Sequence, residues 1–180
     1  MKKYRLGQQP LAVELDRAEV DETLAFVEAM RVDKVDNQVK DMMFDQKNTS
    51  EGINIIGHLG EQAVGKVLDI PVDTEVRTHG DEGWDLEYKG LRIQVKTSTL
   101  PKLIFNAPRL FSADIAILAQ YVGEDRKNAQ ETPQFRIWGW VTKDEFLKNY
   151  YSENFGYGDR LVLDAHSLHS LDCLDDEVGA

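Results

Sequence analysis

Hydrophobic and polar side chains alternate one by one over residues 83–99, and this is the clearest pattern in the chain. The alternation runs on both sides of a Lys89-Gly90 pair, where glycine supplies the backbone freedom that a tight turn needs. A period of two is typical of strands that bury one face. The pattern therefore predicts a β-hairpin whose register places Asp85 opposite Gln94, with Lys96 on the same polar face.

Helical periodicity marks two earlier segments, residues 16–30 and 53–68. In both, apolar side chains recur every three or four residues. Asp16 or Asp21 is the predicted cap of the first helix, and Pro71 marks the end of the second. The remaining predictions for this part of the chain are an irregular segment over residues 1–17, a short helix over 34–44 and a polar loop over 45–52.

Three glycines interrupt the second helical segment, at positions 57, 60 and 65. Each lowers intrinsic helix propensity by up to about 1 kcal/mol relative to alanine. Their presence predicts that the helix backbone lies close against a neighbour, either a sheet or a nucleic acid strand. Glu61 lies among these glycines, with His58 one turn earlier on a similar face.

The other segments complete the pattern of a mixed α/β domain. The predicted elements are strands over residues 71–79, 114–121, 135–141 and 160–163, a loop from Lys102 to Arg109, and a helix capped by Thr142 with Glu145 completing a capping box. We therefore expect a central mixed β-sheet flanked by helices over residues 51–171. An N-terminal helical extension over residues 1–50 would pack on this core, and an acidic tail over 172–180 would be mobile.

Composition and charge narrow the classes of protein. The chain has 180 residues, 42% of them hydrophobic and 29% charged, and contains no stretch of roughly 20 apolar residues that would span a bilayer. With no signal-peptide pattern either, we expect a cytoplasmic protein without a membrane partner. Cys173 is the single cysteine, which excludes an intrachain disulfide and a cysteine-based zinc site. The net charge of −11 argues against a broad, non-specific grip on nucleic acid.

The polar face of the hairpin carries the candidate chemistry. Carboxylates at Glu61 and Asp85 would anchor a hard divalent cation such as Mg²⁺, with the Gln94 amide oxygen and the Val95 carbonyl as further ligands. Lys96 beside the metal would orient or deprotonate an attacking water, or stabilise charge on a phosphate. These are the components of a phosphodiester hydrolase.

This arrangement resembles the PD-(D/E)XK nuclease superfamily over roughly residues 53–121. The resemblance lies in a helix glutamate at Glu61, then Asp85 on one strand, then Gln94-Val95-Lys96 on the next. It implies a restriction-endonuclease-like fold and a DNA endonuclease that uses Mg²⁺, for which Mn²⁺ can substitute. The sequence departs from the superfamily pattern at Gly83-Trp84, which stand where a proline is named, and at Gln94, which replaces an acid and removes one negative charge.

Other interpretations of the same residues stay open. The chain could be a catalytically inactive nucleic-acid-binding or assembly subunit with the nuclease fold, or a protein-interaction module whose acidic surface imitates DNA. Asp85 and Lys96 could form a surface ion pair, and Glu61 could be a plain helix-surface residue. Lys102, Arg109 and His58 are candidate nucleic-acid contacts, with helix packing as the alternative for His58.

The remaining predictions concern individual side chains and the oligomeric state. Glu87 is an extra candidate ligand or a partner for Arg92, and the two histidines His166 and His169 suggest a metal site only if a third ligand joins them. Trp138 and Trp140 are interpreted as core or interface residues. With one active site per chain, cutting both strands of a duplex would favour a homodimer.

Overall fold

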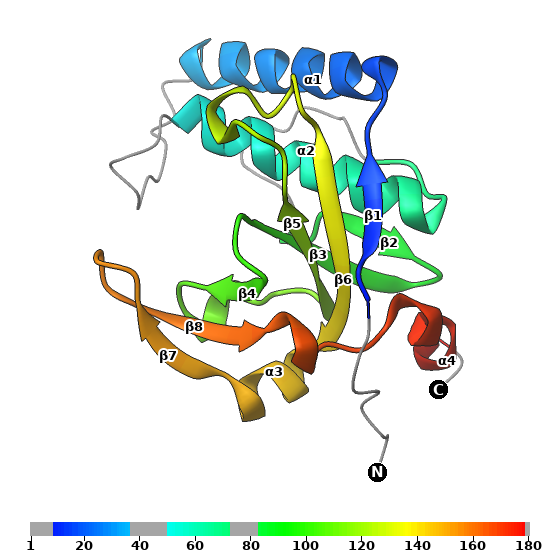
Figure 1. Cartoon of the computed structure of the whole chain (residues 1–180), viewed down its shortest axis with the longest axis vertical. Helices are drawn as coiled ribbons and strands as arrows, with labels where there is room; N and C mark the ends of the chain where they lie inside the picture. Colours follow the sequence, from blue (N-terminus) through cyan, green and yellow to red (C-terminus); the bar gives the residue numbers. More distant parts are fainter. Residues whose placement is uncertain (1–8, 37–49, 73–82, 179–180) are drawn as a thin grey trace.

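The computed structural model describes residues 9–36, 50–72 and 83–178, arranged in three layers (Figure 1). Two helices, α1 (Arg17–Asp36) and α2 (Ser50–Leu68), form the first layer. A five-stranded sheet forms the middle layer, and a three-stranded sheet with helix α3 (Lys143–Asn149) lies on its other face. Within the described ranges, no helix has the length and apolar character needed to cross a membrane.

The middle layer is a mixed sheet with the strand order β1-β6-β5-β3-β2. Its strands are β1 (Leu11–Glu14), β2 (Leu86–Tyr88), β3 (Leu91–Ser98), β5 (Ile115–Tyr121) and β6 (Gln134–Thr142). β3 runs parallel to β5, whereas the other neighbouring pairs are antiparallel. Leu86 lies opposite Ile93, so the predicted hairpin and its register are confirmed. The mixed α/β class is confirmed as well.

The third layer contains strands that the sequence pattern only partly indicated. Its order is β4-β8-β7, with β4 (Lys102–Phe105), β7 (Tyr151–Asn154) and β8 (Asp159–Asp164) all antiparallel. The prediction of a loop from Lys102 is therefore wrong over the four residues of β4. These residues adopt an extended conformation because β8, more than fifty residues later, supplies their hydrogen-bonding partners.

Two apolar cores hold the layers together. One lies between α2 and the main sheet, where Leu59 and Ala63 pack against Ile93 and Ile117. The other lies between the main sheet and the small sheet, and includes Phe105, Phe111, Phe146, Leu118 and Leu163. Because β5 faces both cores, all seven of its residues are buried, which explains its nearly continuous apolar sequence.

The first helix begins as predicted but ends differently. Asp16 Oδ1 accepts from the Glu19 N–H at 3.0 Å, and Glu19 Oε2 accepts from the Asp16 N–H at 2.7 Å, a reciprocal cap. α1 continues without a break to Asp36, so a separate helix starting at residue 34 is wrong for residues 34–36. The rest of that predicted helix, over residues 37–44, lies outside the described residues.

α2 starts at Ser50, within the segment predicted as a loop. The loop prediction is therefore wrong for residues 50–52, and its residues 45–49 lie outside the described chain. The predicted strand over 71–79 lies outside the described chain from residue 73 onward. The predicted helix after Thr142 is confirmed: Thr142 and Glu145 form the capping box of α3.

The segments near both ends of the chain are more ordered than predicted. Residues 11–14 form β1, which pairs with β6, so the prediction of an irregular segment is wrong there and residues 1–50 contribute a strand to the main sheet.

Residues 174–178 form α4 (Leu174–Val178). Leu174 is buried in the first core, and Asp175 Oδ1 accepts from the Tyr88 hydroxyl at 2.9 Å and the Lys89 ammonium at 2.7 Å. The predicted mobile tail is thus a docked helix over these residues. The part of the chain that the structure describes also has four single 3₁₀ turns: η1 (Pro108–Leu110), η2 (Arg126–Asn128), η3 (Ala165–Ser167) and η4 (Leu171–Cys173).

The glycines at positions 57, 60 and 65, three of the four in α2, differ in what surrounds them. A Cβ on Gly60 would lie 2.0 Å from Thr97 Oγ1 on β3, and a Cβ on Gly65 would lie 2.7 Å from a methyl group of Val72. At Gly57 nothing lies within 4 Å of such a Cβ. The expectation of close backbone packing therefore holds at two of these positions, and at Gly60 the neighbour is the strand that carries the candidate site.

Candidate functional site

Asp85 lies immediately before β2, at the point where β2 and β3 separate. Its N–H donates to the Ile93 carbonyl at 2.8 Å, so it continues the ladder and lies opposite Gln94, as predicted. Its carboxylate oxygen Oδ2 accepts from the Val95 N–H at 2.6 Å. We call the region formed by Asp85 and residues 94–96 the fork. The Asp85 side chain takes the place of a backbone acceptor at the fork, beyond the last residue of β2.

The Val95 carbonyl is directed to the same side of β3 as the Asp85 carboxylate. In a β-strand, the N–H and C=O of one residue face the same neighbouring strand. Because the Val95 N–H faces Asp85, its carbonyl faces the fork too. A carboxylate and a backbone carbonyl are the oxygen ligands that Mg²⁺ accepts, with waters and substrate phosphate completing its octahedron. The oxygen ligands available at the fork therefore fit a magnesium ion that keeps several waters.

Gln94 lies beside Asp85, but its amide is engaged elsewhere. The amide nitrogen donates to the Leu110 carbonyl at 3.0 Å, and the amide oxygen accepts from the Ser112 N–H at 3.3 Å. The two ends of the side chain thus hold the last residue of η1 and the segment that follows it. The amide oxygen, predicted to be a metal ligand, binds the Ser112 backbone in the structure.

Lys96 projects from β3 on the same side as Gln94. Its Nζ lies 5.0 Å from the centre of the Phe105 ring on β4. A cation over an aromatic face gains roughly 0.5–1 kcal/mol at exposed sites and more where it is desolvated. Phe105 therefore helps to fix where the ammonium group lies, two residues along the strand from Gln94.

Glu61 lies in a different layer from the fork. It lies on α2, whose buried face covers the side of β3 that carries Ile93 and Val95. Glu61 Oε2 lies 2.8 Å from His58 Nδ1, and the two side chains are 17% and 22% exposed. The Phe26 ring on α1 meets the His58 ring edge-on at 5.2 Å. His58 therefore packs between the helices, the alternative predicted for it, and orients Glu61.

Among the residues that the structure describes, no three His, Cys, Asp or Glu side chains converge in a group that could hold a metal ion. The hairpin brings together four of the predicted site residues, Asp85, Gln94, Val95 and Lys96. Glu61 stays with His58 on the helix layer. The protein oxygens gathered at the fork are thus one carboxylate, that of Asp85, and one backbone carbonyl, that of Val95.

A second set of polar contacts lies next to the fork and was not anticipated. Arg92 forms an ion pair with Asp114 at 2.6 Å, and its backbone N–H donates to the other Asp114 oxygen at 2.9 Å. These hydrogen bonds lower the pKa of Asp114 and raise the pKa of Arg92. The Arg92 guanidinium also lies 5.4 Å from the centre of the Trp84 ring. Glu87 lies opposite Arg92 across the hairpin, but the guanidinium binds Asp114.

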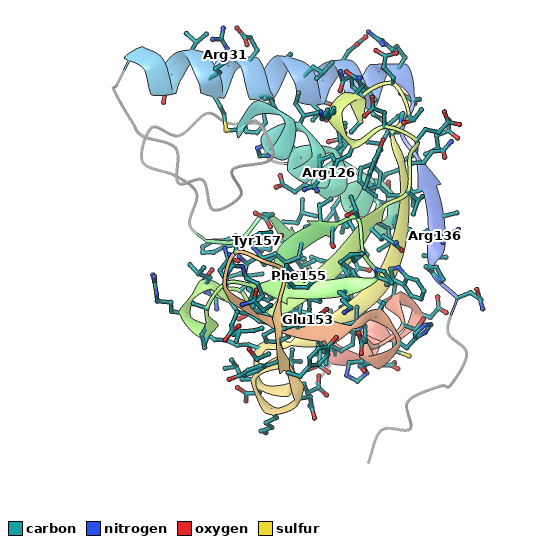
Figure 2. All side chains as sticks on the ribbon, turned by 60° about the vertical axis from the view of Figure 1, so that its left-hand side comes forward. Arg31, Arg126, Arg136, Glu153, Phe155 and Tyr157 are labelled. Atoms are coloured by element: carbon teal, nitrogen blue, oxygen red, sulfur yellow. The ribbon has the colours of Figure 1, made fainter. Side chains whose placement is uncertain are left out.

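The two candidate phosphate contacts in the following segment have different surroundings. Lys102 Nζ lies 2.5 Å from Glu153 Oε2, and this hydrogen bond raises the pKa of Lys102. Figure 2 shows Glu153 and Phe155 together on the β7–β8 hairpin, and the Phe155 ring lies 5.9 Å from the same ammonium. Lys102 therefore joins two strands of the small sheet. Arg109 is exposed on η1, close to the segment that Gln94 holds.

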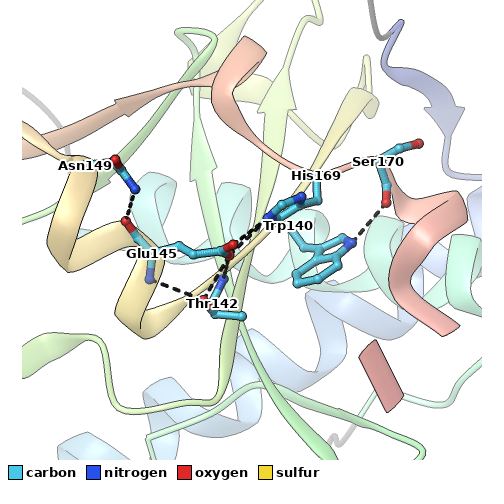
Figure 3. Close-up of polar contacts among 6 residues, drawn as sticks. All are labelled: Trp140, Thr142, Glu145, Asn149, His169 and Ser170. Carbon is cyan, nitrogen blue, oxygen red and sulfur yellow. Dashed lines mark hydrogen bonds and ion pairs between the residues drawn. The ribbon is translucent and has the colours of Figure 1, made fainter. Parts of the chain in front are cut away.

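The histidines and tryptophans near the C-terminus stabilise the fold. His169 Nε2 lies 3.0 Å from both Glu145 oxygens, and the Trp140 indole N–H donates to the Ser170 carbonyl at 2.9 Å (Figure 3). His166 packs edge-on against Trp138, with the ring centres 5.1 Å apart. The two histidines therefore bind different partners, and Trp140 is a core residue as predicted.

Sequence reasoning missed Ser112 and Asp114, which bind the hairpin from about 20 residues away. Their only signal was position: Ser112 is a polar residue between the apolar Phe111 and Ala113, and Asp114 stands directly before the apolar run of β5. The chain matches no family model, no curated protein and no solved structure.

Proposed function

We propose that the protein is a metal-dependent nuclease that hydrolyses phosphodiester bonds in DNA, a PD-(D/E)XK enzyme with a restriction-endonuclease-like fold. One observation carries the proposal. At the fork, the Asp85 carboxylate accepts from the Val95 N–H at 2.6 Å, and β3 carries both the Val95 carbonyl and Lys96. A carboxylate, a carbonyl and an ammonium are groups that metal-assisted phosphodiester hydrolysis can use.

Each residue of the fork has a defined role in this proposal. Asp85 and the Val95 carbonyl would hold Mg²⁺ or Mn²⁺, with Glu61 as the carboxylate from α2. When bound, the metal would act as a Lewis acid toward a phosphoryl oxygen and lower the pKa of a bound water. Lys96, held over Phe105, would place its ammonium against charge that develops on the phosphate or orient the attacking water. Arg109, exposed on η1, would contact a neighbouring phosphate.

The test is cleavage of plasmid, linear single-stranded and branched DNA in Mg²⁺ or Mn²⁺. Asp85→Asn keeps an oxygen that accepts from the Val95 N–H but removes the charge, and Lys96→Met keeps an apolar stem against Phe105. Each is expected to lower the cleavage rate at least about 100-fold, the scale of losing a metal ligand or a positioned proton donor.

Glu124→Gln and Lys148→Met are the matched controls, because both side chains are exposed and far from the fork along the chain. They are expected to cut like wild type. Metal-dependent cleavage that survives both fork substitutions would place the active site elsewhere.

The engaged amide of Gln94 favours a second candidate, a DNA-binding or assembly subunit that does not cut. In this alternative a glutamine stands in place of an acid because the Leu110 carbonyl needs a hydrogen-bond donor and the Ser112 N–H needs an acceptor. The expected signature is DNA binding without cleavage, unchanged in Asp85→Asn and falling steeply with salt concentration.

A further inference from the structure

Residues 110–114 lead from η1 to β5 and bind the β2–β3 hairpin at several points; we call this segment the connector. The Leu110 carbonyl accepts from the Gln94 amide, and the Ser112 N–H donates to the same amide at 3.3 Å. The Asp114 carboxylate binds both the backbone N–H and the guanidinium of Arg92. The connector therefore follows β3 along the residues that carry the candidate site.

Ser112 differs from its neighbours because it contacts both β3 and the segment that leads to Asp85. Its backbone N–H binds Gln94 on β3, and its hydroxyl donates to the Gly83 carbonyl. Gly83 stands two residues before Asp85. One serine thus bridges the strand that carries Gln94 and Lys96 and the segment that delivers the Asp85 carboxylate.

The contact with Gly83 is close, and the backbone of Gly83 is adapted to it. Gly83 has a φ of 88°, in the left-handed region that favours glycine. A Cβ at this position would lie 2.7 Å from Ser112 Oγ. A residue with a side chain would therefore be strained and would press on the serine, so the approach of the segment before Asp85 is set by Gly83 and Ser112 together.

We propose that Ser112 is a positioning residue of the fork: its hydroxyl, by holding Gly83, sets where the Asp85 carboxylate lies relative to β3. The importance of this position for the reaction rests on the proposed function. Asp85 is held on one side by the Ile93 carbonyl and the Val95 N–H, and the chain before it is held by Ser112. Without the hydroxyl, residues 83–84 lose this tether and the carboxylate samples positions away from Val95.

Hydrogen exchange of the Val95 amide reports this positioning directly, because that N–H donates to Asp85. Ser112→Ala removes the hydroxyl and leaves the backbone bond to Gln94. The Val95 amide is expected to exchange about tenfold faster, the scale of one lost hydrogen bond. Ser112→Thr, which keeps a hydroxyl, is expected to restore the wild-type rate. Ser152→Ala, an exposed serine on β7, is the control and is expected to change nothing.

Cleavage kinetics provide the second measurement. Ser112→Ala is expected to lower kcat about tenfold with KM within about twofold, because a displaced carboxylate weakens the transition state more than DNA binding. Threonine is again expected to restore the rate, which a general loss of stability would not explain.

The outcomes separate this inference from the proposed function. If Ser112→Ala leaves the Val95 exchange rate unchanged, or speeds all core amides equally, the inference is wrong whatever the cleavage data show. If wild type does not cut DNA while Ser112→Ala still speeds Val95 exchange selectively, the positioning holds and the nuclease proposal fails. If wild type cuts and Ser112→Ala cuts equally well, the hydroxyl has no role in the reaction and the inference is overturned.

Discussion

At the scale of single residues, Gln94 shows why the chemistry of one side chain decides its role. A glutamine amide donates at one end and accepts at the other, and the structure uses both ends, toward Leu110 and Ser112. An ionised carboxylate would accept from Ser112 but would meet the Leu110 carbonyl without a proton to share. The residue that departs from the superfamily pattern is therefore the one that its local surroundings require.

Gln94→Glu is expected to destabilise the protein by about 1–2 kcal/mol at pH 7, because it leaves the Leu110 carbonyl facing a carboxylate. The facing carbonyl raises the pKa of the folded carboxyl, so the loss is expected to shrink as the pH falls toward roughly 4.3, the ordinary pKa of glutamate, because a protonated carboxyl donates again. Urea unfolding at several pH values measures both effects. Gln94→Ala, which has no ionisable group, serves as the control with a pH-independent loss. A Gln94→Glu protein as stable as wild type at pH 7 would contradict this account of the glutamine.

At the scale of elements, α2 has a strong apolar face, and its glycines have different surroundings. Gly60 lets the helix backbone approach Thr97 on β3, and the Thr97 hydroxyl is buried at this contact. Gly57 has open space around its Cβ position. Sequence alone gave both the same interpretation, because helix propensity does not depend on what the helix packs against.

The matched pair Gly57→Ala and Gly60→Ala separates these two cases. Gly57→Ala is expected to stabilise the protein by up to about 1 kcal/mol, since alanine is the better helix former and meets no neighbour. Gly60→Ala is expected to destabilise it by about 1–3 kcal/mol, because its Cβ overlaps Thr97. Chemical denaturation of both variants checks the difference in sign. Equal effects would mean that α2 does not pack on β3 as closely as the structure shows.

The same scale explains which elements sequence patterns could identify. α2, β5, β6 and α3 carry seven or more residues each with a clear period, a continuous apolar run or a capping box, and all four were predicted. β1, β4 and β7 have four residues each and no clear alternation. They are strands because β6 and β8 pair with them. A four-residue window contains too little pattern to reveal a partner far along the chain.

At the scale of the whole molecule, hydrogen bonds join the C-terminal segment to both the main sheet and α3. The backbones of His169 and Trp140 exchange two hydrogen bonds, of 2.8 and 3.0 Å. The His169 ring binds Glu145 of α3 (Figure 3). Burial raises the pKa of Glu145, but hydrogen bonds from Thr142 and His169 outweigh it, so the pKa lies below its usual value. This contact joins the last segment of the chain to the helix on the small sheet.

The lowered pKa of Glu145 predicts a pH-dependent contribution to stability. A carboxyl whose pKa is lowered by folding adds stability above its unfolded pKa, roughly 4.3, and loses it as the pH falls through the folded value. Glu145→Gln is therefore expected to be less stable than wild type above about pH 5 and to converge with it near pH 3. The difference is expected to stay below about 1 kcal/mol, because the side chain is 35% exposed.

Urea unfolding of Glu145→Gln and wild type from pH 3 to pH 7 measures this contribution, with Glu124→Gln as a control at an exposed site. A gap that stays constant over this range would show that the carboxylate charge does not contribute and that the hydrogen bonds alone matter.

The sequence by itself determined the hairpin and its register, the capped starts of α1 and α3, the apolar face of α2 and the buried strand β5. These follow from local periods and from side chains that bind the backbone within a few residues. Tertiary structure decided the partners: Leu110 and Ser112 for Gln94, Asp114 for Arg92, and Glu153 for Lys102. These contacts join residues separated by 16 to 51 positions, and packing, which no local pattern encodes, brings them together.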